Sequence, residues 1–126
     1  MTSAQILVVE DNERNMKLFS ELLRASGYRT LEATTGERAV ELALEHQPDL
    51  VLMDIQLPDI DGIEALGRLR ADERFVSAPV LALTAQAMEG DRERFLAAGF
   101  DGYLSKPVDI AEFVSTVRRY CNGGGQ

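Results

Sequence analysis

The stretch Leu50-Val51-Leu52-Met53-Asp54 decides the fold expected of this chain. Its four apolar residues do not alternate with polar ones, which is typical of a parallel strand covered by helices on both faces. Pro48 precedes this strand and ends a helix expected over residues 36–47. Because ligands of open α/β sheets bind at the carboxyl ends of the strands, Asp54 is predicted to lie at a ligand-binding edge.

Three further apolar runs end in residues that can handle a phosphoryl group or the metal that accompanies it. They are residues 6–9 before Glu10 and Asp11, residues 80–83 before Thr84, and residues 103–105 before Lys106 and Pro107. The carboxyl ends of parallel strands meet at one edge of a sheet, so we expect these side chains to gather near Asp54.

Segments with the apolar spacing of helices separate the runs. Besides residues 36–47, the expected helices contain residues 16–23, 63–69, 88–98 and 110–117, and a weaker strand is expected over residues 28–33. The last helix has the clearest apolar face, formed by Ile110, Phe113, Val114 and Val117. Five strands alternating with five helices predict an α/β fold with a doubly wound, five-stranded parallel sheet.

Size and composition favour a single domain. The chain has 126 residues, and we expect residues 1–121 to form the domain and residues 122–126 a flexible tail. A net charge of −8 argues against nucleic-acid binding, which needs clustered Lys and Arg. No apolar run approaches the roughly 20 residues of a membrane span. The lone Cys121, expected as a small apolar residue on the last helix, fits a reducing cytoplasm.

The acids Glu10, Asp11 and Asp54 predict a metal site. Three carboxylates at one edge repel one another and need a counter-charge, and Mg²⁺ suits a site of carboxylates, a carbonyl and waters. A helix begins soon after Asp11, so Asp11 alone is equally well read as a helix N-cap. A carboxylate beside Mg²⁺ can also accept a phosphoryl group, and Thr84 and Lys106 would supply a hydroxyl and an ammonium for its oxygens. We further expect a cis bond between Lys106 and Pro107.

Four motifs together resemble the receiver domain of two-component response regulators, the CheY-like superfamily. They are Val9-Glu10-Asp11-Asn12, Met53-Asp54 with the following residues 55–62, Leu83-Thr84-Ala85, and residues 103–107 ending in Lys106-Pro107. The likeness covers essentially the whole chain, and the family fold implies the strand order 2-1-3-4-5. Residues 10–12, 15–19 and 86–91 look most like DivK-type single-domain regulators, although receivers of hybrid kinases share similar stretches.

The resemblance implies a role for each of these positions. Asp54 would be the phosphoryl acceptor. Asp11 would bind Mg²⁺ directly and Glu10 through water, with the backbone carbonyl of Gln56 as a further ligand; Mn²⁺ could replace Mg²⁺. Thr84 and Lys106 would bind the phosphoryl oxygens, and Thr84 with Tyr103 would form the conformational switch.

The resemblance also implies partners. The phosphoryl donor would be a histidine kinase or a histidine phosphotransfer protein, docking near Asn15, Met16 and Phe19. Output would pass to a protein effector through the surface of residues 88–98 and the last strand, with no nucleic acid, no membrane, and a monomer or weak homodimer. The chain would be a signalling protein rather than an enzyme, and it could equally be a receiver module of a longer hybrid kinase or regulator.

Two other functions share parts of the pattern. Asp59-Ile60-Asp61-Gly62 suggests a haloacid-dehalogenase-like phosphatase, but Asp59 follows Pro58 rather than a buried strand. A flavodoxin-like cofactor binder would share the fold, but no Gly-rich phosphate loop follows the first strand. A pure interaction module would not need the set of Asp54, Asp11, Thr84 and Lys106.

Overall fold

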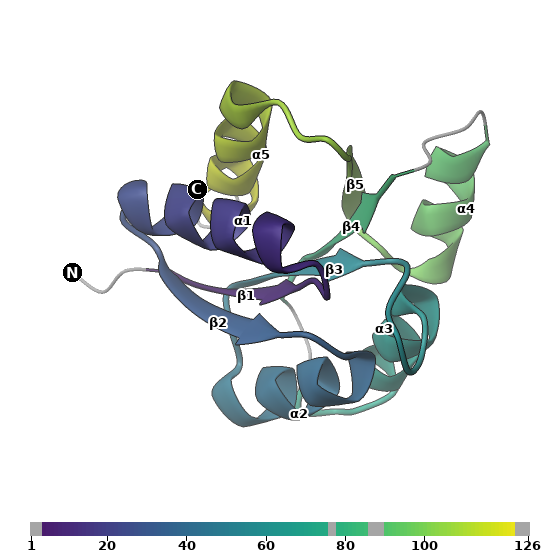
Figure 1. The fold of residues 1–126 in the computed structure, drawn as a ribbon. Coiled ribbons are helices and arrows are strands. Elements are labelled where there is room, and N and C mark those ends of the chain that lie inside the picture. Colours follow the sequence, from purple (N-terminus) through teal and green to yellow (C-terminus); the bar gives the residue numbers. More distant parts are fainter. Residues whose placement is uncertain (1–3, 76–77, 86–89, 123–126) are drawn as a thin grey trace.

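The computed structural model describes residues 4–75, 78–85 and 90–122 and has alternating strands and helices along those residues (Figure 1). In order they are β1 (Gln5–Val9), α1 (Glu13–Ala25), β2 (Arg29–Ala33), α2 (Gly36–His46), β3 (Leu50–Asp54), α3 (Gly62–Arg70), β4 (Val80–Thr84), α4 (Asp91–Ala98), β5 (Gly102–Ser105) and α5 (Ile110–Asn122). The strands form one parallel sheet in the order β2-β1-β3-β4-β5. The predicted fold class and strand order are confirmed.

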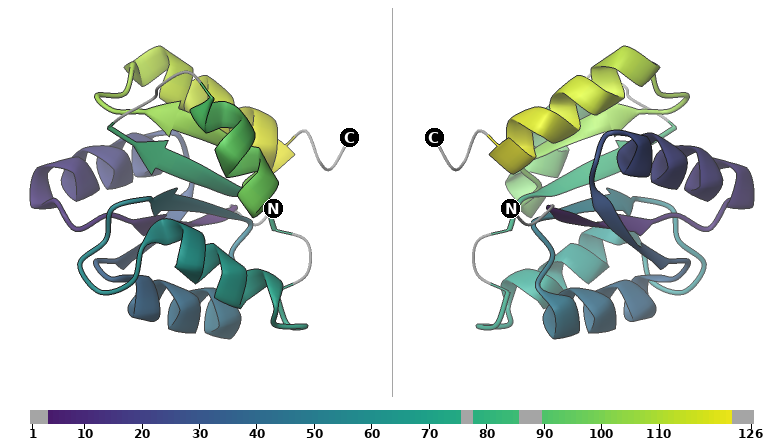
Figure 2. Two further views of the ribbon diagram at one scale, coloured as in Figure 1. Left: turned by 90° about the vertical axis from the view of Figure 1, so that its right-hand side faces the viewer. Right: turned by 90° about the vertical axis from the view of Figure 1, so that its left-hand side faces the viewer.

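Helices cover both faces of the sheet, as the unbroken apolar run of β3 predicted (Figure 2). Alternate strand residues point to opposite faces, so Ile6 and Val8 pack with α1 and α5, whereas Leu7 and Val9 pack with α2 and α3. Every residue of β3 and β4 is buried. On the first face, the rings of Phe19 and Phe113 stack with centroids 5.3 Å apart and join α1 to α5.

The helix starts follow ordinary capping chemistry. The side chains of Asn12, Thr35 and Asp61 accept hydrogen bonds from backbone N–H groups in the first turns of α1, α2 and α3. These caps place the beginning of each helix directly after the loop that follows a strand. The loops that lead into α1 and α3 therefore lie at the carboxyl edge of the sheet.

Two helix predictions need correction. The helix expected from residue 88 begins at Asp91, because Gly90 adopts φ 92°, a left-handed backbone that a helix does not continue through; residues 88 and 89 lie outside the described residues. Ile110 was expected on the buried face of the last helix but is 56% exposed. It is the first residue of α5, and the fully buried residues of that face are Phe113 and Val117.

Helix α5 ends the described part of the chain. Helix α5 continues through Asn122, one residue into the expected tail, and residues 123–126 lie outside the described part of the chain. Cys121 is half-buried against the core, as expected of a small apolar residue. Among the described residues, no helix combines the length and the apolar character that crossing a bilayer requires.

Candidate functional site

The strand register brings the three acids together. Val9 of β1 pairs with Met53 of β3, so the next residues on the two strands, Glu10 and Asp54, emerge side by side at the carboxyl edge. One carboxylate oxygen from each of Glu10, Asp11 and Asp54 lies within 4.8 Å of the others. Acids that are far apart in the sequence thus share one small volume.

Glu10 is the most deeply buried acid of the site, with 1% of its surface exposed. Its Oε2 accepts a hydrogen bond of 3.1 Å from the backbone N–H of Asn12, and its own N–H donates to the carbonyl of Ala33. Burial raises the pKa of Glu10, and the hydrogen bonds from Lys106 and Asn12 offset only part of that rise. The site therefore disfavours the state in which all three carboxylates are ionised without a further counter-charge.

Asp11 faces solvent, and it does not cap the following helix. The N-cap of α1 is Asn12, whose Oδ1 accepts the backbone N–H of Asn15 at 3.0 Å. Of the two readings open for Asp11, the cap is thus wrong. Its carboxylate is left at the mouth of the site, beside Glu10 and Asp54.

Asp54 ends β3 and is 3% exposed. Its Oδ1 accepts the backbone N–H of Gln56 at 2.9 Å, and its Oδ2 accepts a hydrogen bond of 3.0 Å from the Lys106 ammonium. The carboxylate is consequently held at both oxygens in one orientation at the edge of the sheet.

Lys106 supplies the positive charge of the site. Its Nζ lies 3.0 Å from Glu10 Oε1 and 3.0 Å from Asp54 Oδ2. Burial works against the ammonium, but the hydrogen bonds to Asp54 and Glu10 outweigh it, and the pKa of Lys106 is raised. The peptide bond between Lys106 and Pro107 is cis, as expected from the sequence.

Thr84 and Gln56 occupy neighbouring positions. Asp54 pairs with Leu83 across β3 and β4, so Thr84 is one residue further along β4 at the same edge, and it is buried. It ends a strand rather than capping α4, whose N-cap is Gly90. Gln56 follows Asp54 by two residues in the loop between β3 and α3. The structure thus brings Glu10, Asp11, Asp54 and Lys106 into direct proximity and puts Thr84 and Gln56 beside them.

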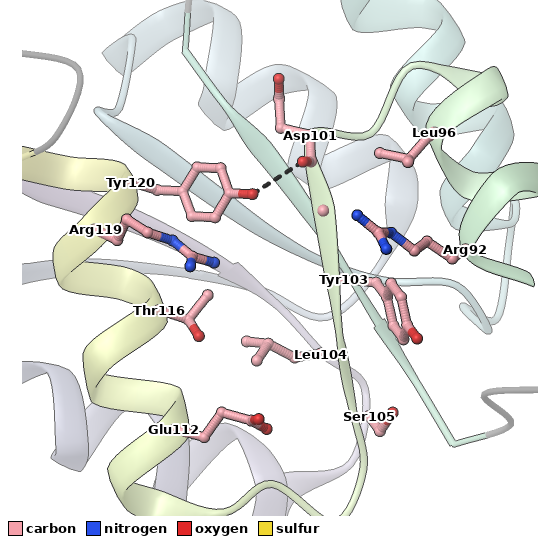
Figure 3. Close-up of a pocket in the computed structure, with 11 residues that line it drawn as sticks. Arg92, Leu96, Asp101, Tyr103, Leu104, Ser105, Glu112, Thr116, Arg119 and Tyr120 are labelled. Carbon is pink, nitrogen blue, oxygen red and sulfur yellow. Dashed lines mark hydrogen bonds between the residues drawn. The ribbon is translucent and has the colours of Figure 1, made fainter.

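Tyr103 lies on β5, the edge strand beyond Thr84. It is half-buried, and its ring packs against Phe95 of α4 with centroids 5.9 Å apart. Figure 3 shows it beside Arg92, on the α4 side of a hollow of about 370 Å³ between α4, β5 and α5. On the other side of this hollow, the Tyr120 hydroxyl donates to the carbonyl of Asp101 (Figure 3). Tyr103 is therefore part of a surface distinct from the acidic cluster.

Asp59 has a structural task that the sequence did not reveal. Its two carboxylate oxygens accept the backbone N–H groups of Gly36 and Glu37 at 2.8 and 2.9 Å, so it binds the start of α2. It lies in a loop rather than at the end of a buried strand, which removes the basis for a dehalogenase-like phosphatase. A sequence signal was absent, because the contact joins segments 22 and 23 residues apart.

The residues of the cluster fit a divalent cation of the Mg²⁺ class. Carboxylate oxygens from two strand ends lie within 4.8 Å, one of them is solvent-exposed, and a loop with backbone carbonyls follows Asp54. Hard cations with oxygen ligands prefer this donor set, and Mg²⁺ in particular keeps several waters beside one or two carboxylates. A cation would also offset the repulsion that a single lysine leaves among three acids.

Comparison with known proteins identifies the family. The sequence pattern described as the response regulator receiver domain matches residues 6–118. The chain belongs to this family. The response regulator DivK of Brucella ovis is 49% identical over 115 residues, which cover 91% of this chain and 94% of DivK. The resemblance to receiver domains, and to DivK in particular, is confirmed.

Solved structures agree with this assignment. The receiver domain of the sensor histidine kinase PA1611 from Pseudomonas aeruginosa, which has a magnesium ion coordinated in its active site cleft, is 40% identical and superimposes with a TM-score of 0.88 over 96% of this chain and 99% of that one. The chemotaxis response regulator CheY4 of Vibrio cholerae is 26% identical, with a TM-score of 0.89 over 94% and 99% of the two chains. This receiver domain is a module of two-component signalling rather than a conventional enzyme.

Proposed function

We propose that this receiver domain accepts a phosphoryl group on Asp54 in a Mg²⁺-dependent reaction. The observation that carries the proposal is the surroundings of Asp54, a buried carboxylate oriented by the Gln56 N–H and the Lys106 ammonium, with Glu10 and Asp11 beside it. The metal ligands would be Asp11, Asp54 and the Gln56 carbonyl, with Glu10 acting through water. Mg²⁺, or Mn²⁺ in its place, would neutralise charge on the phosphoryl oxygens.

The residues of the chain have separate tasks in the transfer. An Asp54 carboxylate oxygen forms a bond to phosphorus while the bond from phosphorus to the donor's imidazole nitrogen breaks, and the electron pair leaves with the imidazole. Lys106, released from its contact with Asp54, would follow the new phosphoryl oxygens, and the Thr84 hydroxyl would donate to another of them. Positioning and charge neutralisation of this kind are the main means of accelerating phosphoryl transfer.

The phosphoryl group would be sensed through Thr84 and Tyr103. Thr84 ends β4 next to β5, where Tyr103 packs against Phe95 of α4, so a movement of Thr84 toward the phosphoryl group would favour a second packing of this ring. The surface that changes would be the hollow between α4, β5 and α5. Its lining has both charges, since Arg92, Arg119 and Glu112 all line it, as expected of a surface that contacts a protein effector.

The donor would be a histidine kinase or a histidine phosphotransfer protein. A hollow of about 600 Å³ runs beside α1 and is lined by Glu10, Asp11, Met16 and Lys17 among others, which would let an imidazole approach the acids. The expected docking residues need one correction, because Phe19 is 1% exposed and belongs to the core. Met16 lines the hollow, although it is itself largely buried.

Intact mass after incubation with acetyl phosphate tests the proposal. In the presence of Mg²⁺ we expect one phosphoryl adduct per chain, with acetate as the leaving group, and we expect no adduct in EDTA. Asp54→Asn should abolish the adduct, whereas Asp72→Asn, which removes a partly exposed carboxylate elsewhere, should leave it unchanged. An adduct that persists in Asp54→Asn, or that forms equally well in EDTA, would refute the proposed acceptor or its metal.

The remaining expectations are part of the same proposal. The protein would work in the cytoplasm as a monomer or weak homodimer, without binding nucleic acid or membrane, either as a single-domain regulator or as a module of a longer one. Sedimentation with and without acetyl phosphate would measure the oligomeric state. A tight dimer in both conditions would contradict the expected monomer or weak homodimer.

A further inference from the structure

Asp59 joins the loop after Asp54 to a helix that takes no direct part in the site. The loop of residues 55–61 connects β3 to α3 and contains Gln56, the proposed carbonyl ligand. Three residues after Gln56 in this loop, Asp59 accepts the N–H of Gly36 through Oδ1 and the N–H of Glu37 through Oδ2. The two N–H groups are the first of α2, where helices leave donors unpaired.

The start of α2 is built to receive this carboxylate. The side chain of Thr35, the N-cap of α2, accepts the N–H of Arg38, and Asp59 accepts the two N–H groups that come before it in the helix. The same N–H groups lower the pKa of Asp59 to about 2, that of Glu37 having the larger effect. The positive end of the α2 dipole also favours the negative charge of Asp59 at this place.

A close backbone approach accompanies the hydrogen bonds. A Cβ added at Gly36 would lie 2.5 Å from Cγ1 of Ile60, so only glycine lets the loop lie this close to α2. The two ends of the loop are also joined, because the N–H of Gly62 donates to the carbonyl of Ile55 at 2.9 Å. The loop is thus closed across its ends and fastened to α2 through Asp59.

We infer that Asp59 is a positioning residue: it fastens the loop to α2 and so keeps the Gln56 carbonyl where it can bind the metal. The inference rests on the proposed function, because it assigns Asp59 to the same metal. Asp59 does not itself bind the cation, since both of its oxygens are occupied by N–H groups of α2. Partners of this outer kind orient the groups that touch a metal, and their loss weakens metal binding.

The Mg²⁺ dissociation constant of the full chain, measured from backbone amide NMR shifts at high ionic strength, tests this inference. Asp59→Asn replaces one acceptor by a donor, and Gly36→Ala pushes Ile60 away without changing the charge. Each variant should raise the dissociation constant by about tenfold, the lower end of the effect expected for an outer partner of a metal site. The amide of Leu57, which shares its peptide group with the Gln56 carbonyl, should show the weakened titration most directly.

Three control variants separate positioning from helix stability, side-chain addition and charge. Thr35→Ala removes a cap from the same helix start without touching the loop, so it should lower the melting temperature in EDTA but leave the dissociation constant unchanged. Gly67→Ala adds a methyl group where no atom lies within 4 Å, and Asp72→Asn removes a partly exposed carboxylate paired with Arg74. Neither should alter Mg²⁺ binding.

The outcomes distinguish the inference from the proposed function. If the wild-type chain binds Mg²⁺ and Asp54→Asn weakens that binding, while Asp59→Asn and Gly36→Ala bind as the wild type does, the positioning role of Asp59 is refuted and the proposed function stands. Weakening by Thr35→Ala as strong as that by Asp59→Asn would also refute this role, in favour of helix stability. A wild-type chain that does not bind Mg²⁺ would refute both.

Discussion

Single side chains at the site show how charge is distributed there. Three carboxylates lie within 4.8 Å of one another, yet among the described residues only Lys106 is paired with two of them. Lys106 contacts Glu10 and Asp54 and leaves Asp11 at the solvent-exposed mouth. Without a cation, the charge of Asp11 therefore adds to the repulsion among the three acids.

Removing the charge of Asp11 should stabilise the metal-free protein. At a separation of no more than 4.8 Å in a largely aqueous environment, one pair of like charges repels by about 1 kcal/mol, so Asp11→Asn should raise the free energy of unfolding in EDTA by about that amount. The same variant should lose the stabilisation that Mg²⁺ is expected to give the wild type. Urea unfolding with and without Mg²⁺ measures both effects, and a less stable Asp11→Asn in EDTA would contradict this account of the site.

At the scale of the elements, the strand ends carry the side chains of the site, and the loops after them lead into the helices. Strands β1, β3 and β4 place acids and hydroxyl at one edge, and the loops that follow β1 and β3 turn away into α1 and α3 within a few residues. The turn after β3 is crowded, because a Cβ at Gly62 would lie 2.4 Å from the carbonyl oxygen of Asp54. The first residue of α3 thus limits where the backbone of Asp54, the proposed phosphoryl acceptor, can lie.

Two glycines of α3 should respond oppositely to alanine. Gly67 is exposed and has no atom within 4 Å of the place that an added methyl group would take, so Gly67→Ala should stabilise the protein by roughly 0.5–1 kcal/mol through helix propensity. Gly62→Ala should instead destabilise it by roughly 1–3 kcal/mol, because the methyl group meets backbone that cannot yield without moving Asp54. Thermal unfolding of both variants measures this contrast, and stabilisation by Gly62→Ala would disprove the close packing.

At the scale of the whole molecule, burial makes stability depend on pH. The raised pKa of Glu10 means that the folded protein holds its proton more tightly than the unfolded chain does. This contribution is complete below the ordinary Glu pKa of 4.5 and is lost as the pH rises through the folded value. Asp59 and Asp72 act in the opposite sense, because their pKa values of about 2 make a contribution that is lost as the pH falls below 3.8.

The metal-free protein should therefore be most stable in mildly acidic solution. We expect the melting temperature in EDTA to fall as the pH rises above 4.5, and we expect Glu10→Gln to flatten that fall by removing the titrating group. Asp72→Asn should flatten only the acidic limb. Melting temperatures of the three proteins between about pH 2 and about pH 8 test the assignment, and a Glu10→Gln variant that declines as steeply as the wild type would reject it.

Much of the molecule follows from local sequence. The apolar runs before Asp54 and Thr84 were sufficient to predict buried parallel strands, because only strands covered on both faces lack polar alternation. The candidate site was predictable for the same reason, since residues that follow such strands must share one edge of the sheet. The beginning of α4 was not, because apolar spacing does not reveal that Gly90 adopts a left-handed backbone.

The sequence by itself thus determined the α/β class, the edge at which Glu10, Asp11, Asp54, Thr84 and Lys106 gather, and the family to which the chain belongs. Only the tertiary structure decided which acids Lys106 contacts, that Asn12 rather than Asp11 caps α1, and that Asp59 fastens the β3–α3 loop to α2. The physical reason is the distance along the chain over which each kind of interaction acts. Strand and helix patterns arise between neighbours in the chain, whereas these contacts depend on how completed elements approach one another in space.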